Sequence, residues 1–173
     1  IAGGSGFRIS PRSCRKVRGM FLSRFFLLIC CCLSGTPFAQ NLVVGAGVDP
    51  DGGGGVVLEY HTGGSFSEAV SNWPWATAIR FDADSDLWAG AGVHQQFALS
   101  ERFFVEASFM PGYYNPEDTD LGGNIHFRSL VGLGLKFRGS SAVSITIDHL
   151  SNGGLTTSNP GSELVTVRYT FDY

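Results

Sequence analysis

Apolar side chains alternate with small or polar ones along most of the chain after residue 40, and this period of two constrains the fold more than any other feature. Successive side chains of a β-strand point to opposite faces of the sheet, so the alternation predicts strands rather than helices. Clusters of Gly, Pro, Asn and Asp interrupt it, as turns require. The pattern predicts eight strands, at residues 41–48, 56–61, 75–82, 87–98, 102–110, 124–137, 142–151 and 163–173.

The two faces of these strands carry different chemistry. Sorting the residues by parity places the large apolar side chains in one set. A soluble barrel would turn that set inward, whereas a barrel that spans a membrane turns it outward toward lipid. The opposite set contains glycines together with three carboxylates and three arginines: Glu59, Glu106, Asp148, Arg80, Arg128 and Arg168.

Four features favour the membrane-spanning arrangement. The strand number is even, the strands approach the roughly 9–11 residues that cross a bilayer at a tilt, an export signal precedes them, and the last strand ends on the aromatic Tyr173. We therefore predict an all-β fold, an eight-stranded antiparallel transmembrane β-barrel whose interior is filled by side chains, with the six charged residues paired inside. The alternative is a soluble lipocalin-like or sandwich domain whose apolar face is an ordinary core.

Residues 20–39 have the features of a cleaved secretory signal peptide. Met20 and the basic Arg24 precede an apolar stretch, and small residues lead to Ala39. The apolar stretch is shorter than the roughly 20 residues of a membrane-spanning helix. We therefore expect an upstream extension at 1–19 that does not belong to the native fold, a signal peptide at 20–39 and an outer-membrane barrel domain at 40–173.

Composition excludes several kinds of site. All four cysteines precede residue 40, so the expected mature chain has no disulfide, no thiolate nucleophile and no cysteine metal site. It keeps six basic residues against 15 acidic ones, a formal charge of −9, which argues against a nucleic-acid partner. No metal or other cofactor is expected. The remaining conspicuous side chains receive structural interpretations: His61, His94 and His126 as scattered structural or surface residues, and Trp73, Trp75, Tyr113 and Tyr114 as an aromatic girdle at the membrane interface.

Three reactive groups fall on the apolar, lipid-facing side of the last two predicted strands. His149 and Ser151 share a face at a separation of about 7 Å along the strand, and Glu163 has the same outward parity on the next strand. Serine needs an adjacent base to become nucleophilic, and the base needs a partner that fixes its tautomer. Asp148 is the obvious acid by sequence, but as the neighbour of His149 it points to the opposite face, where an interior ion pair is expected.

The loop that follows Ser151 contains candidate donors for an oxyanion. Acyl transfer requires hydrogen-bond donors that stabilise the negative oxygen of the intermediate. The backbone at Gly153 and Gly154 and the side-chain amide of Asn159 could supply them. The same residues also suit an ordinary turn, and spacing alone leaves both interpretations open.

The C-terminal residues match a family pattern: His-x-Ser-Asn at 149–152, a glycine-containing loop, Asn-Pro-Gly at 159–161, a glutamate twelve residues after the serine, and a terminal aromatic strand. This pattern resembles the lipid A 3-O-deacylases, the PagL family of outer-membrane β-barrel esterases. The resemblance is tight over residues 142–173, and before them only the barrel pattern agrees. It implies the following roles: Ser151 as nucleophile, His149 as base, Glu163 as acid, and the Gly154 N–H with the Asn159 side chain as oxyanion hole. Asn152 also matches, but its parity turns it inward and implies a supporting role.

Topology places the three reactive groups at one membrane surface. Eight strands leave both ends of the barrel chain on the periplasmic side, so the 152–162 loop is expected outside the cell, level with the outer leaflet of the bacterial outer membrane. Lipid A, as part of lipopolysaccharide, is then the expected substrate and partner, and hydrolysis of its 3-position ester would release a 3-hydroxy fatty acid. The sequence leaves both a monomer and a homodimer open. A non-enzymatic structural or adhesive barrel is the alternative, against which Glu163 argues because an interfacial girdle needs no carboxylate in register with His149.

Overall fold

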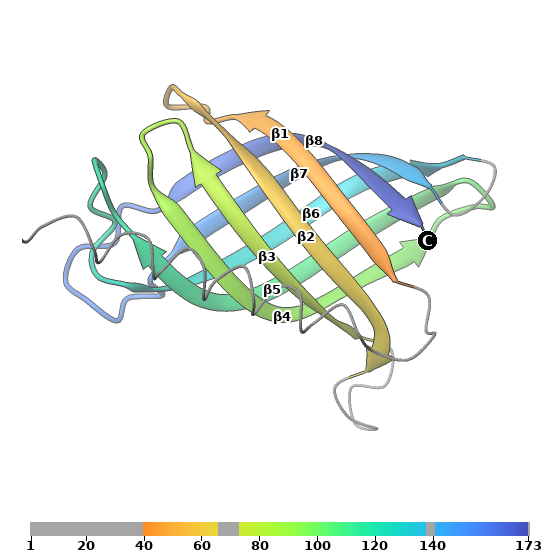
Figure 1. Ribbon diagram of the computed structural model, residues 1–173, viewed down its shortest axis with the longest axis horizontal. Helices are drawn as coiled ribbons and strands as arrows, with labels where there is room; N and C mark the ends of the chain where they lie inside the picture. Colours follow the sequence, from red (N-terminus) through yellow and green to blue (C-terminus); the bar gives the residue numbers. More distant parts are fainter. Residues whose placement is uncertain (1–39, 66–72, 138–140, 173) are drawn as a thin grey trace, which may run out of the picture. The chain divides into compact units, whose positions relative to one another are not determined.

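The computed structural model describes residues 40–65, 73–137 and 141–172. The expected extension at 1–19 and signal peptide at 20–39 lie outside the described residues. The described chain forms eight antiparallel strands in sequence order: β1 (Asn41–Val48), β2 (Gly54–Ser65), β3 (Pro74–Asp82), β4 (Leu87–Ala98), β5 (Phe103–Asn115), β6 (Ile125–Lys136), β7 (Ala142–Ser151) and β8 (Ser162–Asp172). Each strand pairs with its sequence neighbours, and β1 pairs with β8, so the sheet closes on itself (Figure 1).

Closure leaves every strand with two hydrogen-bonded neighbours, which is the arrangement that a sheet needs in a lipid environment. The closing pair is in register over the whole of β1, from Asn41 opposite Asp172 to Val48 opposite Val165. Among the described residues, no helix is long and apolar enough to cross a membrane. The predicted all-β, eight-stranded antiparallel barrel is therefore confirmed.

The strand bounds differ from the prediction mainly in β2 and β5. The prediction ended the fifth strand at residue 110 because Pro and Gly follow, but β5 continues to Asn115. Pro111 still lies opposite Phe127 of β6, whereas the pairing with β4 is interrupted between Gly90–Gly112 and Val93–Phe109. A proline cannot donate to a strand ladder, so β5 accommodates it where the ladder to one neighbour is already open.

The second strand is longer than predicted at both ends. Alternation predicted residues 56–61, and β2 spans Gly54–Ser65. Its first two residues are glycines, and because they have no side chain the apolar–polar alternation cannot show which face of the sheet they occupy. Its register against β3 shifts between His61 and Ser65, and a shift of this kind breaks the period-two pattern from which strands are predicted.

The barrel has an apolar outside and a polar inside, as parity predicted. Large apolar side chains on the outer face, such as Leu58, Phe109, Leu133 and Ile145, are about half exposed or more. All six predicted interior charges are buried. Glycines leave room for the largest interior side chain, because a β-carbon at Gly112 would lie 2.5 Å from the ring of Trp88.

The buried charges form one connected set of ion pairs. Arg128 donates from Nη1 to Oε1 of Glu59 at 2.6 Å and from Nη2 to Oδ2 of Asp148 at 2.8 Å. Nη2 of Arg168 donates to the other Glu59 oxygen at 2.6 Å, and Nη1 of Arg80 donates to Oδ1 of Asp148 at 2.9 Å. The predicted interior pairing is thus confirmed, and these buried side chains occupy the narrow interior of an eight-stranded barrel.

Interior histidines complete this layer. His61 contacts Glu59 at 2.8 Å and His94 contacts Glu106 at 3.0 Å. The two imidazole rings stack with centroids 3.9 Å apart. Their structural interpretation is confirmed, since both are buried against carboxylates inside the barrel.

One member of the predicted aromatic girdle was placed wrongly. Tyr113 is exposed on the outer face, but Tyr114 points inward and is buried. Its hydroxyl donates to Oδ2 of Asp86 and lies 2.7 Å from the carbonyl oxygen of Thr119. The prediction treated both tyrosines as loop residues, whereas alternation within β5 sends them to opposite faces.

We expect Glu59→Gln to lower the free energy of unfolding by about 3–5 kcal/mol, because it leaves two buried guanidinium groups without a full counter-charge. The change is measured by urea unfolding in lipid vesicles, in which the different gel mobility of the folded barrel gives the folded fraction. Glu101→Gln, in the exposed 99–102 turn, is the matched control and should shift the free energy by less than about 0.5 kcal/mol. Equal unfolding midpoints for the two variants would contradict the prediction.

Candidate active site

The three predicted reactive side chains lie at one end of the barrel, which we call the site end. It contains the connections at 49–53, 83–86, 116–124 and 152–161, and the start of β1 and the end of β8 lie at the opposite end (Figure 1). Ser151 is the last residue of β7, and His149 lies two residues before it. Glu163 is the second residue of β8.

The structure brings His149 and Glu163 together on the outer face. The two residues are directly opposite each other in the β7–β8 register. Nδ1 of His149 lies 2.7 Å from Oε1 of Glu163, the distance of a charge-assisted hydrogen bond in which the imidazole N–H donates to the carboxylate. The side chains remain 46% and 43% exposed, so the pair is open to the surroundings of the barrel. This bond leaves Nε2 as the imidazole nitrogen available to a reactant.

Ser151 ends β7 on the same outer face, two residues beyond His149. Among the described residues, its hydroxyl makes no hydrogen bond with His149. Catalytic hydrogen bonds are often longer in a free enzyme and tighten when substrate binds. Phe127 of β6 lies opposite Ser151, and its ring stacks on Phe109 with centroids 5.8 Å apart. The strand position next to Ser151 is therefore occupied by an aromatic residue.

Gly161 packs against the imidazole from the end of the 152–161 loop. Its φ of +74° lies in the region that side chains rarely adopt. A β-carbon there would lie 3.0 Å from Cε1 and 3.8 Å from Nδ1 of His149. The glycine thus lets the loop pass close to the ring that pairs with Glu163.

Asn152 is buried inside the site end and ties two loops together. Its Nδ2 group lies 2.7 Å from the carbonyl oxygens of Gly122, in the 116–124 loop, and Ser158, in the 152–161 loop. Its Oδ1 accepts the N–H of Gly154 at 2.9 Å. This inward placement agrees with its parity, and the contacts are those of a residue that shapes the loops rather than one that meets a ligand.

The two predicted oxyanion donors differ in availability. Asn159 accepts the backbone N–H of Asn152 at Oδ1, 2.9 Å away, and its own side-chain N–H groups donate to none of the described residues. The Gly154 N–H is already bound to Oδ1 of Asn152. The adjacent Gly153 N–H donates to none of the described residues, and the Phe127 ring lies next to this glycine.

Asp148 lies inside the barrel, as predicted. Each of its carboxylate oxygens accepts from a different buried arginine, Arg80 or Arg128. It therefore cannot orient His149, whose side chain points to the opposite face.

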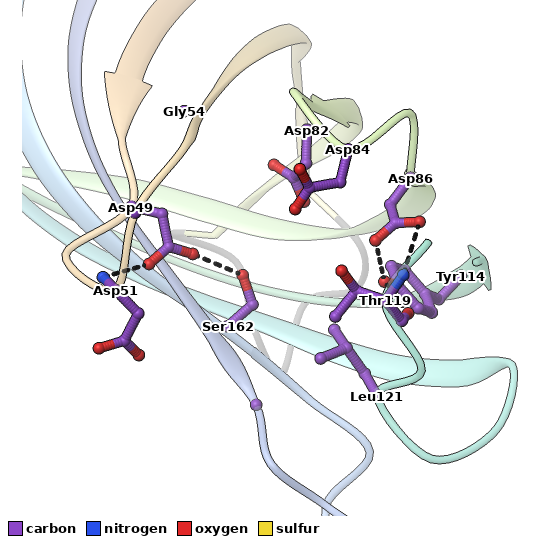
Figure 2. Close-up of a pocket in the computed structure, with 12 residues that line it drawn as sticks. Asp49, Asp51, Gly54, Asp82, Asp84, Asp86, Tyr114, Thr119, Leu121 and Ser162 are labelled. Carbon is purple, nitrogen blue, oxygen red and sulfur yellow. Dashed lines mark hydrogen bonds between the residues drawn. The ribbon is translucent and has the colours of Figure 1, made fainter. Parts of the chain in front are cut away.

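An acidic cavity of about 230 Å³ opens at the site end beside these loops. Figure 2 shows the aspartates that line it, among them Asp49, Asp82 and Asp86. Burial raises the pKa of Asp86, but hydrogen bonds from the backbone N–H groups of residues 117–119 and from the Tyr114 hydroxyl outweigh that effect and hold the pKa below its usual value. Asp86 thus stays ionised and anchors the loop that follows β5. The described residues contain no group of three or more His, Cys, Asp or Glu side chains arranged to hold a metal ion.

Comparison with known proteins assigns the chain to a family. The family model of the lipid A 3-O-deacylases (PagL) matches residues 58–172, which include all the predicted site residues. This chain belongs to the lipid A 3-O-deacylase (PagL) family. A lipid A deacylase PagL of Pseudomonas aeruginosa is 30% identical over 151 residues, covering 76% of this chain and 86% of its own. The PagL of Bordetella bronchiseptica is 26% identical over 108 residues, and the match covers 60% of this chain but only 59% of that relative.

Solved structures agree on the fold of this PagL-family chain. The outer-membrane enzyme PagL superposes with a TM-score of 0.61 at 19% identity, covering 76% of this chain and 98% of that one. A designed transmembrane β-barrel superposes with a TM-score of 0.58 at 12% identity, covering 80% of this chain and 98% of the design. A match to a design without enzymatic ancestry shows that this similarity concerns the barrel itself.

Two contacts of the PagL-family site escaped prediction from sequence. Parity puts Phe127 in the outward apolar set, but only the β6–β7 register places it opposite Ser151. Gly161 is part of the Asn-Pro-Gly pattern at 159–161, but its approach to His149 depends on where the loop returns to β8. Neither contact has a sequence signal of its own, because each joins residues from separate segments.

We expect Asn152→Ala to release the loops at the site end while the barrel stays folded, since Asn152 holds carbonyl oxygens from both of them. Amide hydrogen exchange, read by mass spectrometry, should be faster by about tenfold or more over residues 152–161 and unchanged in β6.

Thr157→Ala, an exposed change in the same loop, is the control and should leave exchange at the wild-type rate. Wild-type exchange in the Asn152→Ala loop would show that the side chain does not hold it.

Proposed function

We propose that the protein is a lipid A 3-O-deacylase, an esterase of the bacterial outer membrane in which Ser151, His149 and Glu163 form a catalytic triad. The observation that carries this proposal is the 2.7 Å contact between Nδ1 of His149 and Oε1 of Glu163 on the outer face of the barrel. A lipid-facing strand pair has no structural need for a carboxylate and an imidazole in register. Family membership supplies the reaction class, and the pair supplies two of the three groups that a serine esterase requires.

The chemistry follows from the position of each atom. Oγ of Ser151 attacks the carbonyl carbon of the ester at the 3-position of lipid A, and Nε2 of His149 accepts the hydroxyl proton. Glu163 keeps the Nδ1 proton in place and stabilises the imidazolium that forms. The tetrahedral intermediate collapses when the sugar oxygen leaves with the proton from His149. Water then attacks the acyl-enzyme, again with His149 as base, and releases a 3-hydroxy fatty acid.

The oxyanion of the intermediate needs hydrogen-bond donors beside Ser151. The Asn159 side chain is well suited, because the backbone N–H of Asn152 engages only its Oδ1. For Gly154, the second proposed donor, the N–H has to exchange its bond to Asn152 for one to substrate. Asn152 keeps the supporting role that its buried position favours.

The site end is proposed to face the cell exterior, with the triad level with the outer leaflet. Outer-membrane barrels place their longer loops outside the cell, and the two longest connections, 116–124 and 152–161, are at the site end. A charged side chain that faces lipid costs roughly 2–4 kcal/mol at the midplane but about 0–1 kcal/mol near the interface. Glu163 at a strand end is thereby energetically acceptable, and lipid A reaches Ser151 laterally from the membrane. Cleavage of a signal peptide at 20–39 is part of this proposal.

Mass spectrometry of lipid A from cells that make the protein tests the proposed reaction. Wild type should remove the mass of one 3-hydroxyacyl group, and Ser151→Ala should remove none. Glu163→Gln should slow the reaction by about 10³–10⁴-fold, as loss of a triad acid does in other serine hydrolases. Ser158→Ala, an exposed serine of the same loop, is the matched control. Unmodified lipid A in the wild-type strain, with the barrel folded in the outer membrane, would contradict the proposal.

We expect Gly161→Ala to lower kcat by about tenfold or more, because its β-carbon meets the imidazole 3.0 Å away and misplacement of a catalytic group is costly. Gly53→Ala is the control: its φ of +94° imposes similar backbone strain, but its β-carbon would meet nothing within 4 Å. Comparable activity in the two variants would mean that contact with His149 has no catalytic consequence.

A further inference from the structure

Arg80 of β3 lies inside the barrel, buried, and its guanidinium holds three acceptors at the site end. Nε donates to Oδ1 of Asp82 at 2.8 Å, Nη1 to Oδ1 of Asp148 at 2.9 Å, and Nη2 to Oγ of Ser162 at 2.5 Å. One rigid fork therefore joins β3 to both β7 and β8 across the interior of the barrel.

Two of these acceptors are the chain neighbours of triad residues. Asp148 precedes His149, and Ser162 precedes Glu163. Alternation sends Asp148 and Ser162 inward and their neighbours outward. Arg80 thus binds, from inside, the two strand segments whose outer face carries the His149–Glu163 pair.

The β7–β8 pair needs such support at this point. Leu150 opposite Ser162 is the last pair before the 152–161 loop, and strand ends open more readily than strand centres. A one-residue slip would turn Glu163 to the other face and remove it from His149. Ser162 also contacts Oδ2 of Asp49 at 3.3 Å (Figure 2), so β8 is held from two directions where it begins.

We propose that Arg80 is a positioning residue for the triad: by holding Asp148 and Ser162 through the barrel wall, it keeps His149 and Glu163 opposite each other. This inference rests on the proposed function for its catalytic consequence. Arg80 touches no reacting atom, and its effect on the reaction passes through Glu163. Arg128 also holds Asp148, but of the arginines in the described interior only Arg80 reaches Ser162 of β8.

Steady-state kinetics with lipid A in mixed micelles tests the catalytic part. Arg80→Lys keeps the positive charge but cannot donate to Asp82, Asp148 and Ser162 at once. We expect kcat to fall by about tenfold or more with KM nearly unchanged, because a small displacement of a catalytic group is enough to slow the reaction. Ser162→Ala removes the β8 acceptor alone and should lower kcat several-fold, and Ser162→Thr should restore it. Arg168→Lys is the matched control, because Arg168 is an equally buried interior arginine that binds Glu59 rather than a neighbour of the triad.

A double-mutant cycle separates positioning from general loosening of the barrel. If Arg80 acts through Glu163, Arg80→Lys in a Glu163→Gln background should lower kcat by less than about twofold. An equal loss in both backgrounds, or wild-type kcat in both Arg80→Lys and Ser162→Ala, would overturn the proposal. If Arg80→Lys fails to fold, as judged by gel mobility, Ser162→Ala in the same cycle decides.

Amide hydrogen exchange gives a second readout that needs no activity. Arg80→Lys and Ser162→Ala should speed exchange over residues 148–151 and 162–164, whereas Arg168→Lys should leave these residues at the wild-type rate. Wild-type exchange in both test variants would show that Arg80 does not hold the strand pair. A wild-type protein that leaves lipid A unmodified would overturn the proposed function instead, while the exchange result would still decide whether Arg80 fixes the pair.

Discussion

Closure of the sheet is the constraint on which the rest of this structure depends. A strand edge cannot be left unpaired in lipid, and β1 meets β8 in full register to complete the ring. Once eight strands close, half of their side chains must fill a narrow interior and the other half must face outward. Charges that enter the interior have to pair with one another, which they do around Glu59 and Asp148.

The candidate site uses both sides of the same barrel wall. Outside, the β7–β8 register places Glu163 opposite His149, and inside, the adjacent residues Asp148 and Ser162 join the arginine network. A polar interior therefore does more than satisfy buried charges. In the proposed enzyme it also supports a reactive pair on a surface that otherwise only contacts lipid, where side chains have few polar neighbours to orient them.

Most of the barrel could be predicted because alternation is a local property that each strand carries in its own sequence. The prediction was wrong where local signals conflict with pairing: Pro111 reads as a turn, yet β5 passes through it, and Tyr114 reads as an interfacial residue, yet it is buried against Asp86. Parity predicted that Glu163 rather than Asp148 shares a face with His149, and the observed contact agrees. The assignment of catalytic roles to Ser151, Gly154 and Asn159 stays a prediction.

The sequence by itself determined the fold class, the outward and inward sets of side chains, and the segment in which His149, Ser151 and Glu163 occur. These follow from a period of two, which needs no knowledge of which strand meets which. Only the tertiary structure decided that Glu163 lies directly opposite His149, that Gly161 packs on the imidazole, and that Arg80 reaches Ser162 across the barrel. Such contacts join residues far apart in the chain, so they depend on strand register, loop path and closure.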